Sequence, residues 1–384
     1  MENPRILFLS TYPPRACGIA TFTQDLLGAL RNTGQCDPGV VAIDNGNAEH
    51  YPPEVKFTLE QQDRDAYPKT AAHISAAADL LMIEHEFGIY GGKSGEFLLD
   101  LTKHLKIPYL VTLHTVLPKP TKKQRDIIAA LARGCRKLVT MSAFSVPMLR
   151  DVYGADVEKI AVIPHGVPEI TVPGRDELKR SEGLTGRFVV STFGLLSPGK
   201  GLEYGIGAVA HLAKKHPEMI YLILGQTHPV IKSRYGERYR EKLEKRAADL
   251  GASENIRFVN RYLTKEEIIR YLTLSDIYMT PYLGKDQAVS GTLAYAAGCG
   301  RVIVSTPYPY AREMLAGGRG LLAEFRRTTP LAACLLEILT HPHEKEKMEM
   351  RMLNLGKTMM WSRVAEKYLA AFGEASEAKE ETSQ

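Results

Sequence analysis

The sequence predicts an α/β protein with two doubly wound domains, each built on a parallel sheet with helices on both faces. Three observations support this fold class. The chain has 384 residues, which suits two domains of ordinary size. Short apolar, β-rich runs alternate with longer segments of helical periodicity. The alternation is interrupted around Val167–Arg187, where prolines and glycines lie among charged residues, and then it begins again.

The first half contains apolar runs that predict buried strands, with helical segments such as Ala20–Leu30 and Thr121–Ala132 between most of them. The predicted strands are Ile6–Leu9, Val40–Ile43, Leu80–Glu84, Tyr109–Leu113, Lys137–Met141 and Ile160–Ile163. Strands that alternate with helices form parallel sheets, so we expect a Rossmann-like N-terminal domain at residues 1–168.

A linker with one short helix is expected at residues 169–187, followed by a second Rossmann-like domain at 188–360. Its predicted strands are Phe188–Phe193, Met219–Leu224, Ile256–Val259, Ile277–Thr280 and Val302–Ser305, and its helices are Leu202–His216, Tyr235–Leu250 and Lys265–Thr273. A last helix at 361–373 is a candidate to cross back to the first domain. The small, charged tail at 374–384 is expected to be disordered.

Composition places the chain among ordinary globular proteins, with 44% hydrophobic and 24% charged residues. The five cysteines are dispersed without a C-x-x-C pair, which favours reduced thiols and a cytoplasmic location over disulfides or a zinc site. No run approaches the length of a membrane span or of a signal-peptide core. We therefore expect no membrane span and no leader.

The net charge of +5 is mild and suits an anionic small molecule, and no nucleic-acid partner is expected. Basic residues flank an apolar helix within 119–137. Such a helix either rests weakly on the inner face of an acidic membrane or presents a solvated basic face. A peripheral location at the inner membrane face is therefore an alternative to a freely cytoplasmic one.

The most informative segment lies between Pro281 and Pro307. A turn that contains Asp286 leads to the sequence Ser-Gly-Thr, which opens a helix of small residues. The exposed N–H groups and the positive dipole end of such a helix bind anions, phosphate above all. The predicted anion-binding residues are Ser290, Gly291 and Thr292. The alternative is a tightly packed helix that binds no ligand.

The segment Ser191–Gly201 follows the first strand of the second domain and carries two candidates for the same ligand. Gly194 permits close approach of the backbone, and the ammonium of Lys200 would neutralise a diphosphate. The spacing of a P-loop is not met, because Gly201 follows Lys200 where a serine or threonine is required. A solvated surface lysine is the alternative.

In the first domain, candidate ligand residues follow three predicted strands, at the edge where doubly wound folds bind ligands. Arg15 and Gly18 lie in a proline-stiffened loop after the first strand, where Arg15 would meet an anion or an acceptor hydroxyl. His85 and Glu86 precede a glycine-rich loop, and carboxylates accept hydrogen bonds from sugar hydroxyls. His114 ends a buried strand. We identify no third ligand that would complete a metal site.

Taken together, these segments resemble the GT-B glycosyltransferases, especially family 4, the retaining nucleotide-sugar enzymes. The resemblance covers roughly residues 5–372. The motifs that carry it are Y-P-P-R-A-C-G-I-A-T-F at the start, I-P-H-G-V at the junction, F-G-L-L-S-P-G-K-G, and S-G-T-L-A-Y-A-A-G-C-G-R-V-I-V-S-T-P.

The resemblance implies that the N-terminal domain binds the acceptor and the C-terminal domain the nucleotide sugar. Lys200 matches the phosphate-binding lysine, Gly18 a glycine near the transferred sugar, and His114 the histidine that contacts the donor sugar. Phe258–Leu263 matches the segment that contacts the base, which points to Tyr262 and Leu263. The family typically needs no bound metal, because cationic side chains and helix N-termini stabilise the leaving diphosphate.

The chain also departs from the family pattern. Two glutamates separated by seven residues are usual, and Asp286 and Ala294 stand in their places, so the residue that binds the ribose is missing. The arginine that usually accompanies the lysine is Leu195. The residues that could compensate for the missing arginine in binding the diphosphate are Ser290, Thr292, Arg301 and Arg312. A further departure is His165, which replaces an asparagine before the junction glycine.

The leading hypothesis is a retaining glycosyltransferase that moves a hexosyl group, mannose or glucose first, from a UDP- or GDP-sugar to a saccharide or lipid-linked acceptor. Lys200 and the helix at Ser290 would stabilise the departing diphosphate, Asp286 would orient a hydroxyl of the donor sugar, and His114 would contact its outer edge. The first alternative is a phosphorylase of the same architecture that uses inorganic phosphate. The second is a catalytically silent sugar- or nucleotide-binding partner of a transferase.

Overall fold

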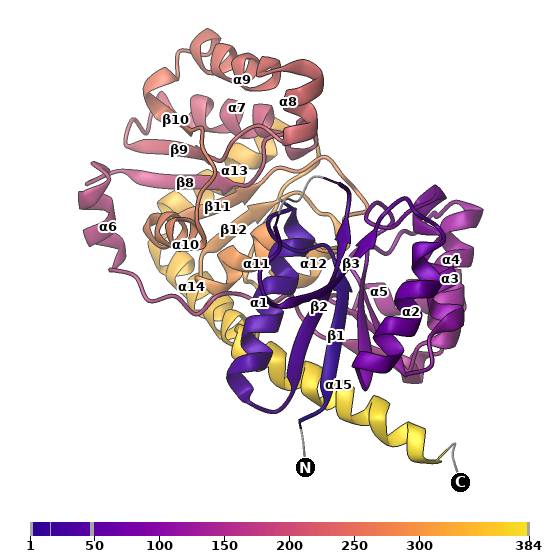
Figure 1. The fold of residues 1–384 in the computed structure, drawn as a ribbon. Coiled ribbons are helices and arrows are strands. Elements are labelled where there is room, and N and C mark those ends of the chain that lie inside the picture. Colours follow the sequence, from indigo (N-terminus) through magenta and orange to yellow (C-terminus); the bar gives the residue numbers. More distant parts are fainter. Residues whose placement is uncertain (1–2, 16, 47–49, 382–384) are drawn as a thin grey trace. The chain divides into compact units, whose positions relative to one another are not determined.

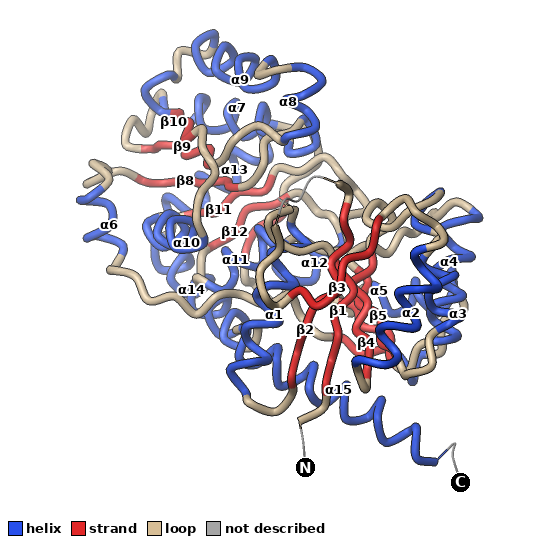
Figure 2. Tube along the Cα trace, in the orientation of Figure 1, coloured by secondary structure: helices blue, strands red, loops and turns tan. Residues whose placement is uncertain are grey.

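The computed structural model describes residues 3–15, 17–46 and 50–381, and it divides into two compact units. Unit 1 consists of residues 1–166 and 360–384, and unit 2 of residues 167–359. The strands of each unit form a sheet of their own (Figure 2). All strand pairs described in both sheets are parallel. This arrangement confirms the predicted fold class.

Unit 1 is built on a seven-stranded sheet with the order β3-β2-β1-β4-β5-β6-β7. Its strands are β1 (Arg5–Ser10), β2 (Asp37–Asp44), β3 (Val55–Glu60), β4 (Leu80–His85), β5 (Tyr109–Leu113), β6 (Lys137–Thr140) and β7 (Ile160–Val162). Its α-helices are α1 (Gly18–Thr33), α2 (Ala66–Ala77), α3 (Leu98–His104), α4 (Lys122–Gly134), α5 (Ser145–Tyr153) and α15 (Trp361–Glu381). Helices α1 and α15 pack together on one face, and α2 to α5 cover the other (Figure 1).

Unit 2 is built on a six-stranded sheet with the order β10-β9-β8-β11-β12-β13. Its strands are β8 (Phe188–Phe193), β9 (Met219–Leu224), β10 (Ile256–Val259), β11 (Ile277–Thr280), β12 (Val302–Ser305) and β13 (Gly320–Leu322). Its α-helices are α6 (Arg175–Ser181), α7 (Leu202–Ala213), α8 (Pro229–Tyr235), α9 (Arg238–Asp249), α10 (Lys265–Leu274), α11 (Gly291–Gly298), α12 (Pro309–Leu315), α13 (Thr328–Thr340) and α14 (Pro342–Lys357). The buried core of this unit is formed mainly by β8, β9, β11 and β12 with α7 and α13.

Local signals explain several helix boundaries. Thr121 caps α4 and Thr264 caps α10. The hydroxyl of each threonine accepts the backbone N–H of Gln124 or Glu267, and the side chain of that residue accepts the threonine N–H in return. The predicted helix at Tyr235–Leu250 is two helices, α8 and α9, because Gly236 between them has a φ of 62°.

The segment at 169–187, predicted as a linker, belongs to unit 2. Its helix α6 packs on α10, and the Lys179 ammonium lies 2.6 Å from a carboxylate oxygen of Asp276. Asp276 also accepts a hydrogen bond from the Val189 N–H and faces Arg175 and Lys345. A buried charge with this many partners ties the segment firmly to the sheet.

The last helix is longer than predicted. Helix α15 runs from Trp361 to Glu381, so most of the tail expected to be disordered at 374–384 is helical, and residues 382–384 lie outside the described residues. Within unit 1, Trp361 packs against Gly166, and the hydroxyl of Tyr368 is hydrogen-bonded to that of Thr112 in β5. The aromatic ring of Phe372 contacts Phe8 in β1. These contacts make α15 part of the core of unit 1.

Candidate functional site

In unit 2, the candidate site begins where β8 ends. Gly194 has a φ of 126°, and a Cβ atom placed on it would lie 3.4 Å from both the Nζ atom of Lys200 and a methyl group of Thr292. Its neighbour Gly225, at a φ of 128°, leaves no room for a side chain, because a Cβ atom there would approach the Gly194 carbonyl to 2.3 Å. Two glycines thus bring the backbone close to the predicted lysine.

Lys200 is held by an aromatic residue, Tyr282, that the sequence analysis did not select. Its ammonium donates a hydrogen bond to the Tyr282 hydroxyl at 2.7 Å and lies 4.2 Å from the centre of the same ring. The tyrosine is itself buried and stacks on Tyr308 with 5.8 Å between ring centres. The lysine is therefore not the solvated surface residue of the alternative interpretation.

The tyrosine links the lysine to the start of α11. Its hydroxyl lies 2.8 Å from the hydroxyl of Thr292, which lies 3.2 Å from that of Ser290. Ser290 caps the helix by accepting a hydrogen bond from the N–H of Leu293, as its place before the small-residue helix predicts. The predicted anion-binding residues of unit 2 are thus neighbours: Lys200, Gly194, Ser290, Thr292, and Gly291 at the first position of α11.

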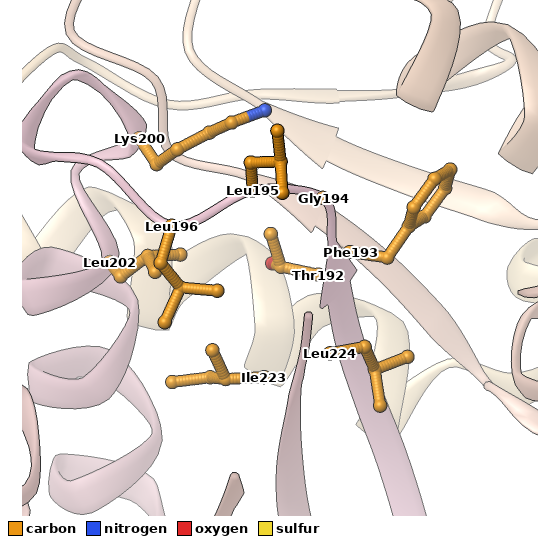
Figure 3. Close-up of a pocket in the computed structure, with 9 residues that line it drawn as sticks. All are labelled: Thr192, Phe193, Gly194, Leu195, Leu196, Lys200, Leu202, Ile223 and Leu224. Atoms are coloured by element: carbon orange, nitrogen blue, oxygen red, sulfur yellow. The ribbon is translucent and has the colours of Figure 1, made fainter. Parts of the chain in front are cut away.

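A small hollow lies beside this cluster (Figure 3). It is lined by Thr192, Phe193, Gly194, Leu195, Leu196, Lys200, Leu202, Ile223 and Leu224. The Lys200 side chain extends over the end of the strand towards Gly194, and most of the other lining side chains are apolar (Figure 3). One cation above an apolar floor suits an anionic group better than a neutral polar one.

The other residues predicted in unit 2 are placed separately. Asp286 lies exposed in the turn between β11 and α11, and Ala294 is buried within α11. Tyr262 is 62% exposed after β10, whereas the neighbouring Leu263 is buried. Arg301 donates to the carbonyl groups of Cys299, Thr273 and Ser275, so it is committed to helix ends.

In unit 1, the predicted residues gather at the ends of β4 and β5. The Nε2 atom of His114 lies 2.8 Å from a carboxylate oxygen of Glu84. The hydroxyl of Thr115 donates to Glu86, whose other oxygen accepts the N–H of Phe87. The sequence places Glu84 beside His85 and Glu86 in one cluster at this strand end, but Glu84 was not selected as a binding residue. The signal for it is a carboxylate at the end of an otherwise apolar run.

His85 does not occupy the position expected of a sugar-binding residue. It is fully buried between the rings of Phe87 and Tyr90, and neither ring nitrogen has a hydrogen-bond partner in the part of the chain that the structure describes. Burial is the main cause that lowers the pKa of His85 to about 3. A side chain without exposed atoms cannot contact a ligand, so this expectation is corrected. Its neighbour Glu86 is half-buried and accessible.

The loop after β1 places the remaining candidates. Arg15 donates to the side chain of Gln61, which in turn donates to the carbonyl of Gly88 in the loop after β4. Gly18 is the exposed first residue of α1, with open space beside its Cα atom. Cys17 caps this helix through its sulfur atom. The loops after β1 and β4 are therefore joined through Gln61, with Arg15 at one end.

Among the residues that the structure describes, no group of three or more histidine, cysteine, aspartate or glutamate side chains lies together in a way that would hold a metal ion. No helix in this part of the chain has the length and apolar character needed to cross a bilayer.

The sequence matches two family models that together span most of the chain. Residues 17–169 match the model of Glycosyltransferase Family 4, and residues 174–354 match the model of Glycosyl transferases group 1.

Curated relatives include D-inositol 3-phosphate glycosyltransferases. The protein from Stackebrandtia nassauensis is 27% identical over 247 residues, which is 62% of this chain and 54% of the relative. The protein from Actinosynnema mirum is 25% identical over 281 residues, covering 70% of this chain and 64% of the relative. The chain thus matches between about half and two thirds of the length of these relatives.

Solved structures share the fold over nearly the whole chain. Anabaena HepE in complex with UDP superposes with a TM-score of 0.78 at 16% identity, covering 96% of this chain and 99% of that one. Sucrose-phosphate synthase from Thermosynechococcus elongatus gives a TM-score of 0.79 at 16% identity, with 98% and 100% covered. With this fold, the two family matches and the paired Rossmann-like units, the chain belongs to the family 4 glycosyltransferases of GT-B architecture.

Proposed function

We propose that this protein is a retaining glycosyltransferase that transfers a hexosyl group from a nucleoside-diphosphate sugar, with UDP and GDP as the candidate nucleotides. The cluster around Lys200 carries the proposal. It combines a cation, three hydroxyl groups and the N-terminus of α11, and a chain of hydrogen bonds runs from Lys200 through Tyr282 and Thr292 to Ser290. This is the set of groups that stabilises a departing diphosphate.

In this proposal unit 2 binds the donor. Gly194, Ser290, Gly291 and Thr292 bind the diphosphate with Lys200, while the segment around Tyr262 and the backbone of Leu263 contact the base. Tyr282 takes a role that the sequence analysis assigned to no residue, because its hydroxyl orients the ammonium. Asp286, exposed in its turn, orients a hydroxyl of the transferred sugar.

Unit 1 binds the acceptor in this proposal. Arg15, Gly18 and Glu86 lie at or near the carboxyl ends of β1 and β4, where α/β sheets bind ligands. Carboxylate and guanidinium groups match the hydroxyls of a saccharide. His114, partly exposed at the end of β5, contacts the transferred sugar. Mannose and glucose remain the first candidates for the sugar, and a saccharide or lipid-linked molecule for the acceptor.

Ligand-dependent stabilisation tests the donor assignment. Thermal unfolding is measured with UDP, GDP, ADP and inorganic phosphate, and we expect the cognate nucleoside diphosphate to raise Tm most. Turnover is then measured as transfer or hydrolysis of the matching sugar nucleotides. Lys200→Ala is expected to abolish both effects, and Lys215→Ala, an exposed change in the loop at the far end of α7, serves as the matched control.

One observation favours the phosphorylase alternative. Ala294 is fully buried and apolar at the position where a family glutamate would hold the ribose, so nothing at this position requires a nucleoside. Stabilisation by inorganic phosphate but by no nucleotide, together with phosphorolysis of a saccharide, would replace the leading proposal by this one. Nucleotide binding without any turnover would instead indicate a silent partner of a transferase.

A further inference from the structure

A buried acid–base pair lies at the ends of β4 and β5 in unit 1. The carboxyl group of Glu84 has no solvent exposure, and the imidazole of His114 retains 11%. Glu84 uses Oε2 to bond Nε2 of the imidazole at 2.8 Å, while its Oε1 is buried without a hydrogen-bond partner among the described residues. Because Nε2 is occupied by the carboxyl group, Nδ1 is the ring nitrogen that remains for a ligand.

The groups around this pair are neutral. His85 and His165 have pKa values lowered by burial to about 3 and about 4. Burial also holds the pKa values of Tyr90 and Tyr368 well above the ordinary value for tyrosine. Phe22 packs edge-on against the His114 ring.

Two further observations complete the surroundings. Glu86, the next carboxylate along the chain, is bonded to Thr115 and to the N–H of Phe87. Among the interactions described for Glu84, His114 is the one basic partner. The charge of the buried carboxyl group is therefore balanced by this imidazole or by a proton.

Charge balance determines how many protons the pair holds. A buried pair with a net charge of −1 is costly, and burial accordingly raises the pKa of Glu84. The net-neutral pair contains two protons, one shared between Oε2 and Nε2 and one on Nδ1. This holds whether the shared proton lies nearer the oxygen or nearer the nitrogen. In either arrangement Nδ1 carries a hydrogen atom.

We propose that Glu84 is a positioning residue that fixes the His114 ring and keeps Nδ1 protonated, so that His114 donates a hydrogen bond from Nδ1 to an oxygen of the transferred sugar. The identity of the ligand rests on the proposed function, whereas the protonation of the ring does not. A hydrogen-bond donor at Nδ1 of His114 favours ligand oxygens that can accept a hydrogen bond, and a sugar hydroxyl is one of these.

The protonation is tested without any substrate. Nitrogen-15 NMR of protein labelled at histidine, near pH 7, reports which imidazole nitrogens carry protons, and the His114 signals are assigned by their loss in His114→Gln. We expect a protonated Nδ1. A ring with a bare Nδ1 and a proton on Nε2 would overturn the inference, even if the protein proved to be an active transferase.

Kinetics test the positioning role. Glu84→Leu removes the partner of Nε2, and we expect kcat to fall roughly tenfold or more while KM for the sugar nucleotide changes little. Glu84→Gln retains a side chain whose amide N–H can donate to Nε2 and leave the proton on Nδ1, so it should recover part of the activity. Unchanged kcat in Glu84→Leu would refute the role.

Tyr109→Phe is the matched control. It deletes a buried hydroxyl at the start of β5, the end of the strand opposite His114, and should lower stability without altering the His114 signals or kcat. If no sugar nucleotide supports turnover in the unmodified protein, the proposed function fails while the NMR result still decides the state of the pair. Should neither Glu84 variant fold, the spectrum of the unmodified protein remains decisive.

Discussion

At the scale of single residues, Tyr282 determines how Lys200 is presented. An ammonium on a long side chain normally samples many rotamers, and fixing it costs conformational entropy. Here the hydroxyl of the tyrosine lies between the Lys200 ammonium and the Thr292 hydroxyl, at 2.7 and 2.8 Å. The Lys200 ammonium is thus oriented before a ligand binds. Part of the conformational entropy of this side chain is therefore already lost on folding and is not lost again on binding.

Removing this hydroxyl should weaken ligand binding more than it weakens the fold. Tyr282→Phe keeps the ring, its stacking on Tyr308 and its contact with the ammonium. We expect the Kd for the nucleoside diphosphate to rise roughly five- to tenfold, which corresponds to about 1 kcal/mol. Isothermal titration calorimetry provides the measurement.

A tyrosine outside the site provides the control for that experiment. Tyr271→Phe removes a hydroxyl of α10 that donates to Glu182 rather than to a group of the Lys200 cluster. It should lower the free energy of unfolding by about 1 kcal/mol or less and leave Kd unchanged. Equal effects of both variants on Kd would show that Tyr282 acts through stability alone.

Buried His85 makes a separate, pH-dependent contribution to stability. Its pKa in the folded protein is about 3, below the ordinary value of 6.5, because burial disfavours the imidazolium. As the pH falls below about 6.5, His85 of the unfolded chain becomes protonated, whereas His85 of the folded protein stays neutral until the pH reaches about 3. The free energy of unfolding should therefore decrease by up to about 1.4 kcal/mol per pH unit from this group.

A leucine at this position should remove that dependence. In His85→Leu we expect the slope of unfolding free energy between pH 6 and pH 4 to be shallower by about 1.4 kcal/mol per pH unit, as measured by urea unfolding. His343→Gln changes a histidine whose side chain is 92% exposed and should leave the slope unaltered. An identical slope in His85→Leu would mean that the buried ring becomes charged in the native state.

The sequence pattern pointed to some members of the Lys200 cluster and of the Glu84–His114 pair and missed others, and the difference has a physical reason. Lys200, Ser290 and Thr292 were recognisable because a helix start and a nearby cation have a local signature. Glu84 and Tyr282 were not, since their roles depend on side chains from other strands and helices. A glutamate in an apolar strand is a local anomaly, but its partner His114 lies 30 residues away.

At the scale of elements, Gly201 shows how one backbone position supports the site. It follows the short 3₁₀ turn that carries Lys200 and has a φ of 61°. A Cβ atom there would approach the carbonyl oxygen of Pro281 to 2.2 Å. The turn can therefore pack against the end of β11 only with glycine at this position.

Substitution of this glycine should cost more than backbone strain alone. Gly201→Ala is expected to lower the free energy of unfolding by roughly 3 kcal/mol, the sum of a left-handed residue and a steric clash. Gly183→Ala is the matched control, because its φ is 67° and its surroundings are open, so about 1 kcal/mol is expected. Chemical unfolding of both variants gives the comparison, and equal losses would contradict the steric argument.

Interior strands were predictable, and so were the edge strands β7 and β10, whereas the edge strands β3 and β13 were not. Strands such as β4 and β9 are buried along their whole length, which produces continuous apolar runs. The strands β3 and β13 lie at the sheet edges. The sequence analysis missed β3 because polar residues alternate with apolar ones along it, and it missed β13 because this strand is three residues long and begins with glycine.

At the scale of the whole molecule, the chain leaves unit 1 at Gly166 and returns at Met360, so unit 1 is completed by the last helix. Val364, Tyr368 and Phe372 of α15 are all buried. Because the core of unit 1 is completed by the C-terminal segment, its stability depends on residues synthesised after all of unit 2. The stability of unit 2 does not share that dependence.

Matched core substitutions should separate the two units. Tyr368→Ala removes a fully buried ring from unit 1, and Leu335→Ala removes a fully buried side chain from α13 of unit 2. Each is expected to lower stability by about 3 to 5 kcal/mol in its own unit. Amide hydrogen exchange followed by mass spectrometry should show faster exchange in β1 and β5 for the first variant and in β8 and β12 for the second.

Since we assign the nucleotide to unit 2, Tyr368→Ala should retain the Kd for the nucleoside diphosphate in its folded population. Faster exchange in both sheets for either variant would instead mean that the two units unfold as one cooperative system, and the stability of the donor site would then depend on α15 as well.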